Sequence, residues 1–404
     1  YMLSGYTIIL IHDYKKGFAV SLKGGESRDV KEPSSQTVVR GPKDGFTEML
    51  RTNTALIRRK IKSPNLWIET KPIGRETMTD VAIMYIKDIA NEKTVEEVRR
   101  RLEKIDIDGI LESGYIEEFI QDEVYTPFPT VLNTERPDSV AAGLLEGRIA
   151  ILVDGTPFVL LVPALFIDFF QSSEDYYMRF DISTLIRLIR YISFFLALFV
   201  PSLYIAVVTF HQEMLPPSLL MSIASQKEGV PFPTVIEVVI MEITFEILRE
   251  AGIRMPRAIG SAISIVGALV LGESAVNAGI ISPAMVIIVS ITAISSFVSP
   301  AFIMNTSVRM LRFIFMILAA TFGLYGIILG VIAMILHLCS IRSFGIPYMT
   351  PIGPFINDDQ SDFIFRAPHW KMHSRPRLIN QKNIIRENTT GPTKPHTQND
   401  TEEK

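Results

Sequence analysis

Residues 231–256, PFPTVIEVVIMEITFEILREAGIRMP, decide how the rest of this chain is interpreted. The stretch is apolar enough for a membrane, yet it contains four glutamates. On a helix that advances 100° per residue, Glu242, Glu246 and Glu250 share an arc of about 100° with Arg249. A bare carboxylate is costly in hydrocarbon, so this stripe must face water, a cation or a basic partner. Two interpretations stay open: an amphipathic helix in the membrane interface, or a helix that lines an aqueous path.

Other polar or helix-breaking residues lie within or beside the apolar runs. Glu273 lies in GALVLGESAVNAG, either as a functional residue inside the membrane or as a residue beyond a helix end. Prolines interrupt most of the apolar runs, and broken helices often surround the ion or substrate paths of channels and transporters. We therefore predict a set of pore and gating residues: Glu242, Glu246, Glu250, Glu273, Glu237, Pro231 and Pro233.

The composition changes along the chain and predicts its domains. We expect a cytoplasmic α/β domain over 1–156, a linker or interfacial segment over 157–186, a transmembrane domain over 187–340, and a polar, partly disordered tail over 341–404. The net charge of −3 and the lack of a basic patch argue against a nucleic-acid partner. The single Cys339 excludes an intrachain disulfide, and we find no catalytic arrangement. We therefore expect no enzyme, no metal site and no cofactor.

Local patterns predict the elements of the first domain. Thr94 is the expected N-cap of a charged helix, with Glu97 completing a capping box. The chain begins without methionine, and we expect it to be truncated there. We predict strands over 6–11, 18–22, 66–70, 81–86, 148–153 and 158–162, and helices over 46–61, 94–104, 116–121 and 137–145. Residues 157–170 are too short to span a membrane and form either the last strand followed by an interfacial helix, which we favour, or a re-entrant piece.

Two apolar runs, Tyr191–Phe210 and Phe313–Leu336, are long enough to cross a membrane. Arginines before the first run place the α/β domain on the cytoplasmic side. With the acidic helix counted as a span, the chain has five crossings and its tail lies outside. The basic residues of 366–386 favour the tail inside, and these two arguments conflict. An extra re-entrant crossing would remove the conflict, as would an interfacial acidic helix.

Several ordered blocks carry a resemblance that covers nearly the whole chain. They include EPSSQTVVRGPKDGFTE (32–48), TPFPTVLNTERPD (126–138), LLEGRIAILVDGTPFVLLVP (144–163), SIVGALVLGESAVNAGIISP (264–283) and FGIPYMTPIGPF (344–355). With SSEDYY (172–177) and the 231–256 stretch, they resemble the A-subunit family of bacterial spore germinant receptors.

The resemblance implies a subunit of a receptor in the inner membrane of the dormant spore. Its implied partners are a transporter-like B subunit and a lipoprotein C subunit, and its implied activity is that of an oligomeric, ligand-gated channel for monovalent cations. The acidic stripe agrees with this, because carboxylates along an aqueous path favour cations. Two alternatives remain: a related stage V sporulation protein associated with dipicolinic acid transport, or a scaffold subunit that conducts nothing. A solute carrier is disfavoured, since the spans show no internal repeat.

Overall fold

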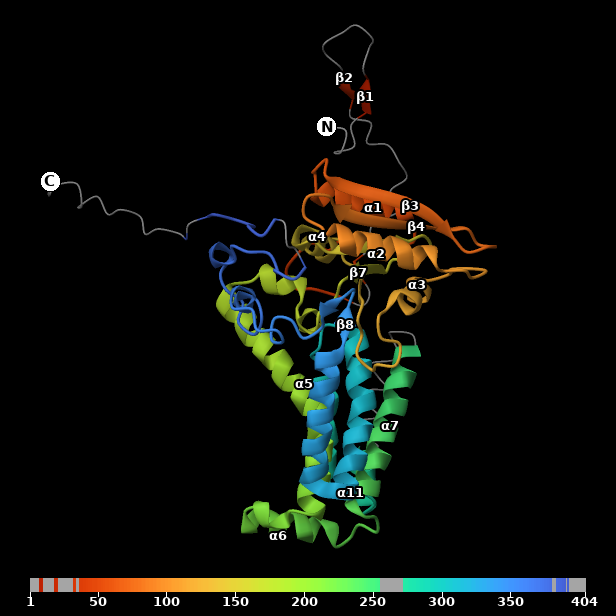
Figure 1. The fold of residues 1–404 in the computed structure, drawn as a ribbon. Coiled ribbons are helices and arrows are strands. Elements are labelled where there is room, and N and C mark those ends of the chain that lie inside the picture. Colours follow the sequence, from red (N-terminus) through yellow and green to blue (C-terminus); the bar gives the residue numbers. More distant parts are fainter. Residues whose placement is uncertain are drawn as a thin grey trace, which may run out of the picture. The chain divides into compact units, whose positions relative to one another are not determined.

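The computed structural model describes residues 7–9, 18–20, 32–33, 36–254, 272–379, 383–389 and 391 (Figure 1). The chain divides into two compact units. The α/β unit comprises Tyr1–Val124, Thr130–Leu185 and Ile341–Lys404, and the helical unit comprises Tyr125–Pro129 and Ile186–Ser340.

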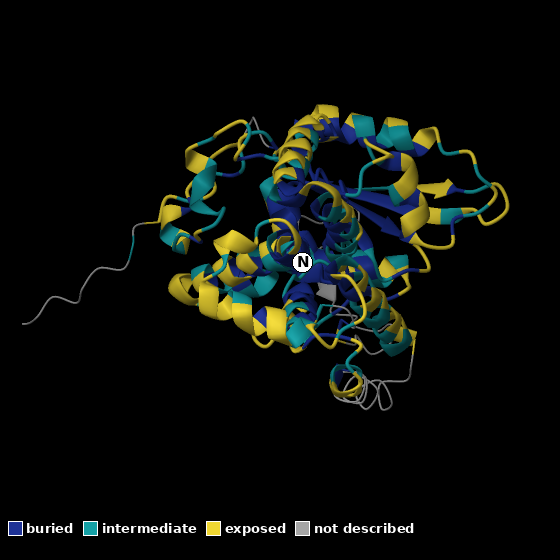
Figure 2. Ribbon diagram, turned by 90° about the horizontal axis from the view of Figure 1, so that it is seen from below, coloured by how far each residue is buried: buried dark blue, intermediate teal, exposed yellow. Residues whose placement is uncertain are grey.

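An antiparallel sheet of five strands forms the centre of the α/β unit, in the order β3-β4-β6-β7-β5. Successive side chains of a strand point to opposite faces of a sheet. In β4, Ile83 therefore faces one helix layer while Met84 faces the other, and both are buried. Figure 2 shows strands of the sheet in the dark blue of buried residues. The register places Ile83 opposite Ile151 of β6. The strands are β3 (Leu66–Ile73), β4 (Thr79–Ile86), β5 (Leu132–Thr134), β6 (Ile149–Val153) and β7 (Val159–Val162).

Two helices cover each face of this sheet. Helices α1 (Leu50–Lys60) and α4 (Pro137–Glu146) pack on one face, and α2 (Glu92–Glu103) and α3 (Ser113–Ile120) pack on the other. The predicted capping box of α2 is wrong. The helix begins two residues earlier, because the side chain of Asn91 accepts a hydrogen bond from the backbone N–H of Lys93.

The α/β unit also contains short strands and 3-10 turns outside the five-stranded sheet. Strands β1 (Thr7–Ile9) and β2 (Phe18–Val20) pair antiparallel, as the sequence predicts, while their connecting turn lies outside the described residues. The 3-10 turns η2 (Phe166–Phe170) and η3 (Ser173–Tyr176) follow β7. All five side chains of η2 are buried in the α/β unit, so the predicted interfacial helix is wrong at this point.

The segment after Ile341 folds onto the α/β unit, where the sequence predicts a separate polar tail. The Ser343 hydroxyl donates to the carbonyl of Thr130 at 2.7 Å and accepts from the N–H of Ala164 at 3.0 Å. The ring of Tyr348 is fully buried against Phe166. This segment contains β8 (Arg342–Ser343), β9 (Ile346–Pro347), η6 (Asp358–Ser361) and η7 (His369–Lys371).

Long helices make up the helical unit. Two stretches, Phe180–Phe210 and Phe302–Ser340, are long and apolar enough to cross a membrane. The first predicted span, Tyr191–Phe210, lies in α5, which starts earlier and continues through Pro201. The apolar sequence over 258–272 lies almost wholly outside the described residues. The elements are α5 (Phe180–Thr209), η4 (Gln212–Met214), α6 (Pro217–Lys227), α7 (Thr234–Arg254), α9 (Gly272–Asn277), α10 (Pro283–Phe297) and α11 (Phe302–Ser340).

Helix α11 is a hairpin of two antiparallel halves, and the single predicted span Phe313–Leu336 is wrong. The chain turns back at Gly323, whose φ of 60° and ψ of −141° suit only glycine. A Cβ atom on Gly330 would lie 2.7 Å from the Phe315 ring. In a straight helix these two residues would lie about 22 Å apart along the axis. Figure 1 shows the two halves side by side.

Candidate functional site

A group of buried charges joins α7 to the first half of α11. We call Glu242, Glu246, Arg249, Arg309 and Arg312 the charge cluster. The Arg312 guanidinium donates to Glu242, and both side chains are 0% exposed. The Arg309 guanidinium donates to Glu246 at 2.9 Å. Burying charges in an apolar interior is tolerated only when they are paired, so these ion pairs fix which faces of the two helices meet.

The local spacing explains the pairing. Glu242 and Glu246 are four residues apart and Arg309 and Arg312 are three apart, so each helix presents its two charges on one side. Of the three partners that the sequence allows for the acidic stripe, the structure shows the basic one for these two glutamates. Within this single chain, Glu242 does not face water.

The cluster is incompletely paired among the described residues. It holds three guanidinium groups against two carboxylates. One oxygen of Glu242 and two nitrogens of Arg312, Nε and Nη2, are buried without a hydrogen bond. Arg249 donates to Ser296 of α10, and its guanidinium lies 5.1 Å from the centre of the Phe297 ring. Part of the hydrogen-bonding capacity of the cluster is therefore unused in this arrangement of the helices.

The other predicted residues lie apart from the cluster. Glu237 is fully buried, and one of its carboxylate oxygens accepts hydrogen bonds from the N–H and hydroxyl of Ser282, each at 2.5 Å. Glu250 is exposed and pairs with Arg254 at 2.6 Å. Glu273 is exposed in the first turn of α9. Pro231 and Pro233 are exposed and precede α7.

Sequence reasoning missed the basic half of the cluster. The acidic stripe did not identify its basic partners Arg309 and Arg312, although a spacing of three residues places these two arginines on one side of a helix. Sequence reasoning also missed the segment Tyr125–Pro129, which belongs to the helical unit. There, Ser307 donates to the carbonyl of Pro127, and Thr126 Oγ1 lies 2.9 Å from His337 Nε2. No sequence pattern pointed to these contacts.

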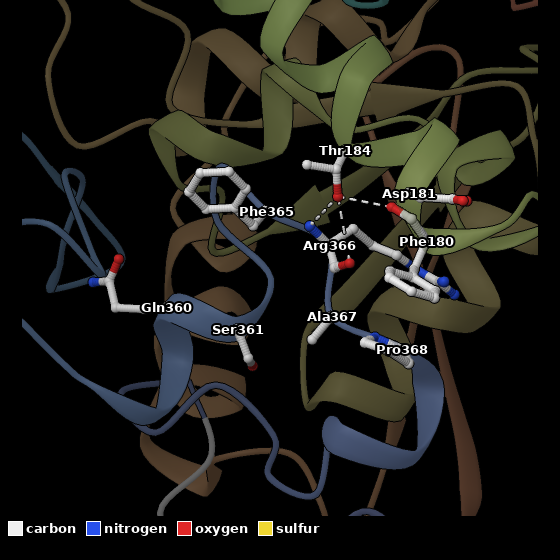
Figure 3. A pocket seen from close by; sticks show the side chains of 9 residues that line it. All are labelled: Phe180, Asp181, Thr184, Gln360, Ser361, Phe365, Arg366, Ala367 and Pro368. Atoms are coloured by element: carbon white, nitrogen blue, oxygen red, sulfur yellow. Dashed lines mark hydrogen bonds between the residues drawn. The ribbon is translucent and has the colours of Figure 1, made fainter. Parts of the chain in front are cut away.

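A pocket of about 350 Å³ lies in the α/β unit between the start of α5 and the C-terminal segment (Figure 3). Thr184 accepts a hydrogen bond from the N–H of Arg366 at 3.1 Å and donates to the carbonyl of Phe180 at 2.7 Å. The buried Arg366 guanidinium contacts the side chain of His369 and the ring of Tyr176. The lining is mostly apolar. No group of metal-binding side chains occurs among the described residues.

Comparison with known proteins assigns the chain to a family. Residues 1–378 match the family described as Bacillus/Clostridium GerA spore germination protein, and the chain belongs to it. Spore germination protein KA of Bacillus subtilis is 56% identical, over 96% of this chain and 71% of that protein. Spore germination protein GerLA of Bacillus cereus is 44% identical, over 94% of this chain and 77% of that protein. The uncharacterised membrane protein YfkQ of Bacillus subtilis is 50% identical, over 95% of this chain and 74% of that protein.

A solved structure corresponds to the first domain. It is the N-terminal domain of the A subunit of the Bacillus megaterium spore germinant receptor GerK3, with 64% identity over 30% of this chain and 98% of the solved chain, and a TM-score of 0.26. The sequence identity shows that the α/β domain is homologous to this A-subunit domain. The family and these relatives support a role in a germinant receptor.

Proposed function

We propose that this chain is the A-type membrane subunit of a nutrient receptor that triggers spore germination, and that copies of it form a ligand-gated channel for monovalent cations. Family membership and the two long apolar helices support this proposal. A transporter-like B subunit and a lipoprotein C subunit are its proposed partners. The proposed location is the inner membrane of the spore, with several crossings.

The α/β unit supports a specific topology. It contains both the start of α5 and the segment that follows α11, so the chain leaves it and returns to it. The number of crossings must then be even. Helices α5, α7 and the two halves of α11 would supply four crossings, and the shorter apolar stretches α10 and 258–272 are the candidates for the fifth and sixth. This places the basic residues after position 366 inside, which removes the conflict in the sequence analysis.

The buried pair of Glu242 and Arg312 is the observation that carries the gating mechanism. Charges buried among apolar helices rarely improve stability over an apolar core, so their presence favours a switching role. We assign the charge cluster as a latch that holds α7 against α11 in the closed state. Ligand binding on a partner subunit would favour the state in which these helices separate. Exposed Glu250 and Glu273 remain the candidates for residues that line the ion path.

Ion flux through the full-length protein in liposomes, with and without its partner subunits, tests the proposal. The substitution Glu246→Gln removes the charge that pairs with Arg309, and should raise the cation flux without ligand. Glu213→Gln is the matched control, because Glu213 is an exposed acid of the same unit without a partner among the described residues.

The outcomes separate the channel from a scaffold. Cation flux that rises in Glu246→Gln and not in Glu213→Gln supports the latch. Flux that is equal in both variants and the wild type contradicts the latch and leaves the channel standing. A folded, oligomeric protein that conducts no ions, with or without its partners, contradicts the channel and favours a scaffold.

A further inference from the structure

Helix α3 of the α/β unit exposes an apolar and acidic face to solvent. Tyr115 and Phe119 lie four residues apart on α3, and Leu111 lies just before the helix begins; these residues are 41%, 52% and 68% exposed. Glu118 on the helix and Glu123 just past its end are exposed and have no partner among the described residues. We call these five residues the acidic-aromatic face. Large apolar side chains that recur on one side of a helix mark an interaction surface.

Helix α1 of the same unit exposes the complementary charge. Arg51, Arg58, Arg59 and Lys62 lie on its outer side or just past its end, and none has an ion pair among the described residues. Arg51, Arg59 and Lys62 are exposed, while Arg58 is half-buried. We call these four residues the basic stripe. Lys60, which lies beside them in sequence, already pairs with Asp44 at 3.0 Å.

The two surfaces lie on opposite sides of the sheet. The inner side of α3 packs on the face that also holds α2, and the inner side of α1 packs on the face that also holds α4. One copy therefore presents its acidic-aromatic face and its basic stripe in opposite directions. A two-fold dimer cannot join both pairs of surfaces at once, whereas a head-to-tail arrangement can, and it closes into a ring when the rotation allows.

We propose that the acidic-aromatic face of one copy docks on the basic stripe of a second copy of this chain. The guanidinium groups of Arg58 and Arg59 would stack on the rings of Tyr115 and Phe119, a pairing that combines cation–π attraction with planar packing. Glu118 and Glu123 would pair with Arg51 and Lys62. Tyrosine, phenylalanine and arginine are the residues that protein interfaces favour.

The charge of the acidic-aromatic face favours a second copy of this chain over a lipid surface as its binding partner. The inner surface of a cell membrane carries anionic lipids, which repel a face that contains Glu118 and Glu123. A second copy supplies four positive charges on a surface that its own chain leaves unpaired. This inference deepens the homo-oligomer of the proposed function and rests on it.

Disulfide cross-linking of the full-length protein in membranes tests the interface. Cys339 is the chain's single cysteine, and Cys339→Ser provides a background without thiols. In that background, Phe119→Cys combined with Arg59→Cys should give a ladder of cross-linked species larger than dimers, and each single variant should give none. Glu118→Arg with Glu123→Arg should lower the cross-linked fraction several-fold, and adding Arg51→Glu with Lys62→Glu should restore it.

Each alternative result has a defined meaning. Dimers from Phe119→Cys alone would show a two-fold contact and overturn the head-to-tail interface. No cross-link in a protein that light scattering shows to be oligomeric would overturn this interface and leave the proposed function intact. No cross-link in a protein that is monomeric in both membranes and detergent would contradict the interface and the oligomer together.

Discussion

The half-buried carboxyl of Glu117 in α3 gives the α/β unit a dependence on pH. Burial, followed by the nearby charge of Glu112, raises the pKa of Glu117 from 4.5 to about 7, against a hydrogen bond with Asn133 that lowers it. Between these two values the folded state keeps a proton that the unfolded state has released. The contribution of Glu117 to the free energy of unfolding therefore falls as the pH rises from 4.5 to 7.

The substitution Glu117→Gln tests this dependence, because an amide does not ionise. It should stabilise the unit by about 1–3 kcal/mol at pH 8 and have little effect at pH 4. Denaturant unfolding of the full-length protein can be followed by tryptophan fluorescence, since both tryptophans, Trp67 and Trp370, lie in the α/β unit. Glu118→Gln, an exposed neighbour, is the control. An equal gain at both pH values would show that the charge of Glu117 is not the cause.

Substitutions of the ion pair between Glu242 and Arg312 test how much the pair contributes to the stability of the helical unit. Glu242→Gln leaves the Arg312 charge buried without its counter-charge, and should destabilise the helical unit by about 3–5 kcal/mol. Glu242→Leu combined with Arg312→Met replaces both charges by apolar groups and should recover most of this loss. Thermal unfolding in detergent measures both effects. If the double variant is as unstable as Glu242→Gln, the ion pair contributes to stability by more than neutralising a buried charge.

Residue patterns predicted the acidic half of this pair and missed the basic half. Amphipathic spacing identifies Glu242 and Glu246 as a stripe, because a helix of known period fixes which side chains share a face. It does not show which other helix meets that face. The match between Glu246 and Arg309 spans 63 residues of sequence, so it depends on how the helices pack. Glu237 is fully buried, and its hydrogen bonds with Ser282 depend on the same packing.

At the scale of elements, the length of the apolar run alone led to a wrong prediction for α11. The run from Phe313 to Leu336 is uninterrupted by charge, so length predicts one span. The turn depends on Gly323, one of three glycines in this run, and an isolated glycine within a helical pattern is a weak signal of a break. The strands of the sheet were predicted more accurately, because their apolar side chains and bounding turns are local features.

Substituting Gly323 tests the hairpin. A Cβ atom at this position would lie 2.8 Å from the His211 ring and 3.1 Å from Cβ of Phe210, and the backbone φ of 60° adds strain. Gly323→Ala should therefore lower the unfolding temperature of the helical unit more than Gly345→Ala lowers that of the α/β unit, which contains Gly345. Gly345 has a φ of 80° and open space around it, so its substitution carries the strain without the clash. Equal effects in thermal unfolding would contradict a tight turn at Gly323.

At the scale of the whole molecule, the composition predicted an α/β domain and a transmembrane domain of different chemistry. It wrongly treated the residues after Ile341 as a separate tail. Residues after Ile341 are polar on average, yet the few apolar ones, such as Ile346 and Tyr348, are buried against the α/β unit. An average over a segment cannot show that its apolar side chains meet a distant surface. This return of the chain to its first domain is what requires an even number of crossings in the proposed topology.

Cysteine labelling in intact cells tests that topology. In a Cys339→Ser background, a cysteine at Glu213, between α5 and α6, should react with a thiol reagent that cannot cross the membrane. Cysteines at Arg59 in the α/β unit and at Asp358 in the C-terminal segment should react only after the cells are permeabilised. If Asp358→Cys reacts in intact cells while Arg59→Cys does not, the C-terminal segment lies outside. The number of crossings would then be odd, and the contacts of Ser343 with Thr130 and Ala164 could not form in the membrane-embedded protein, because the two sides of those contacts would be separated by the bilayer.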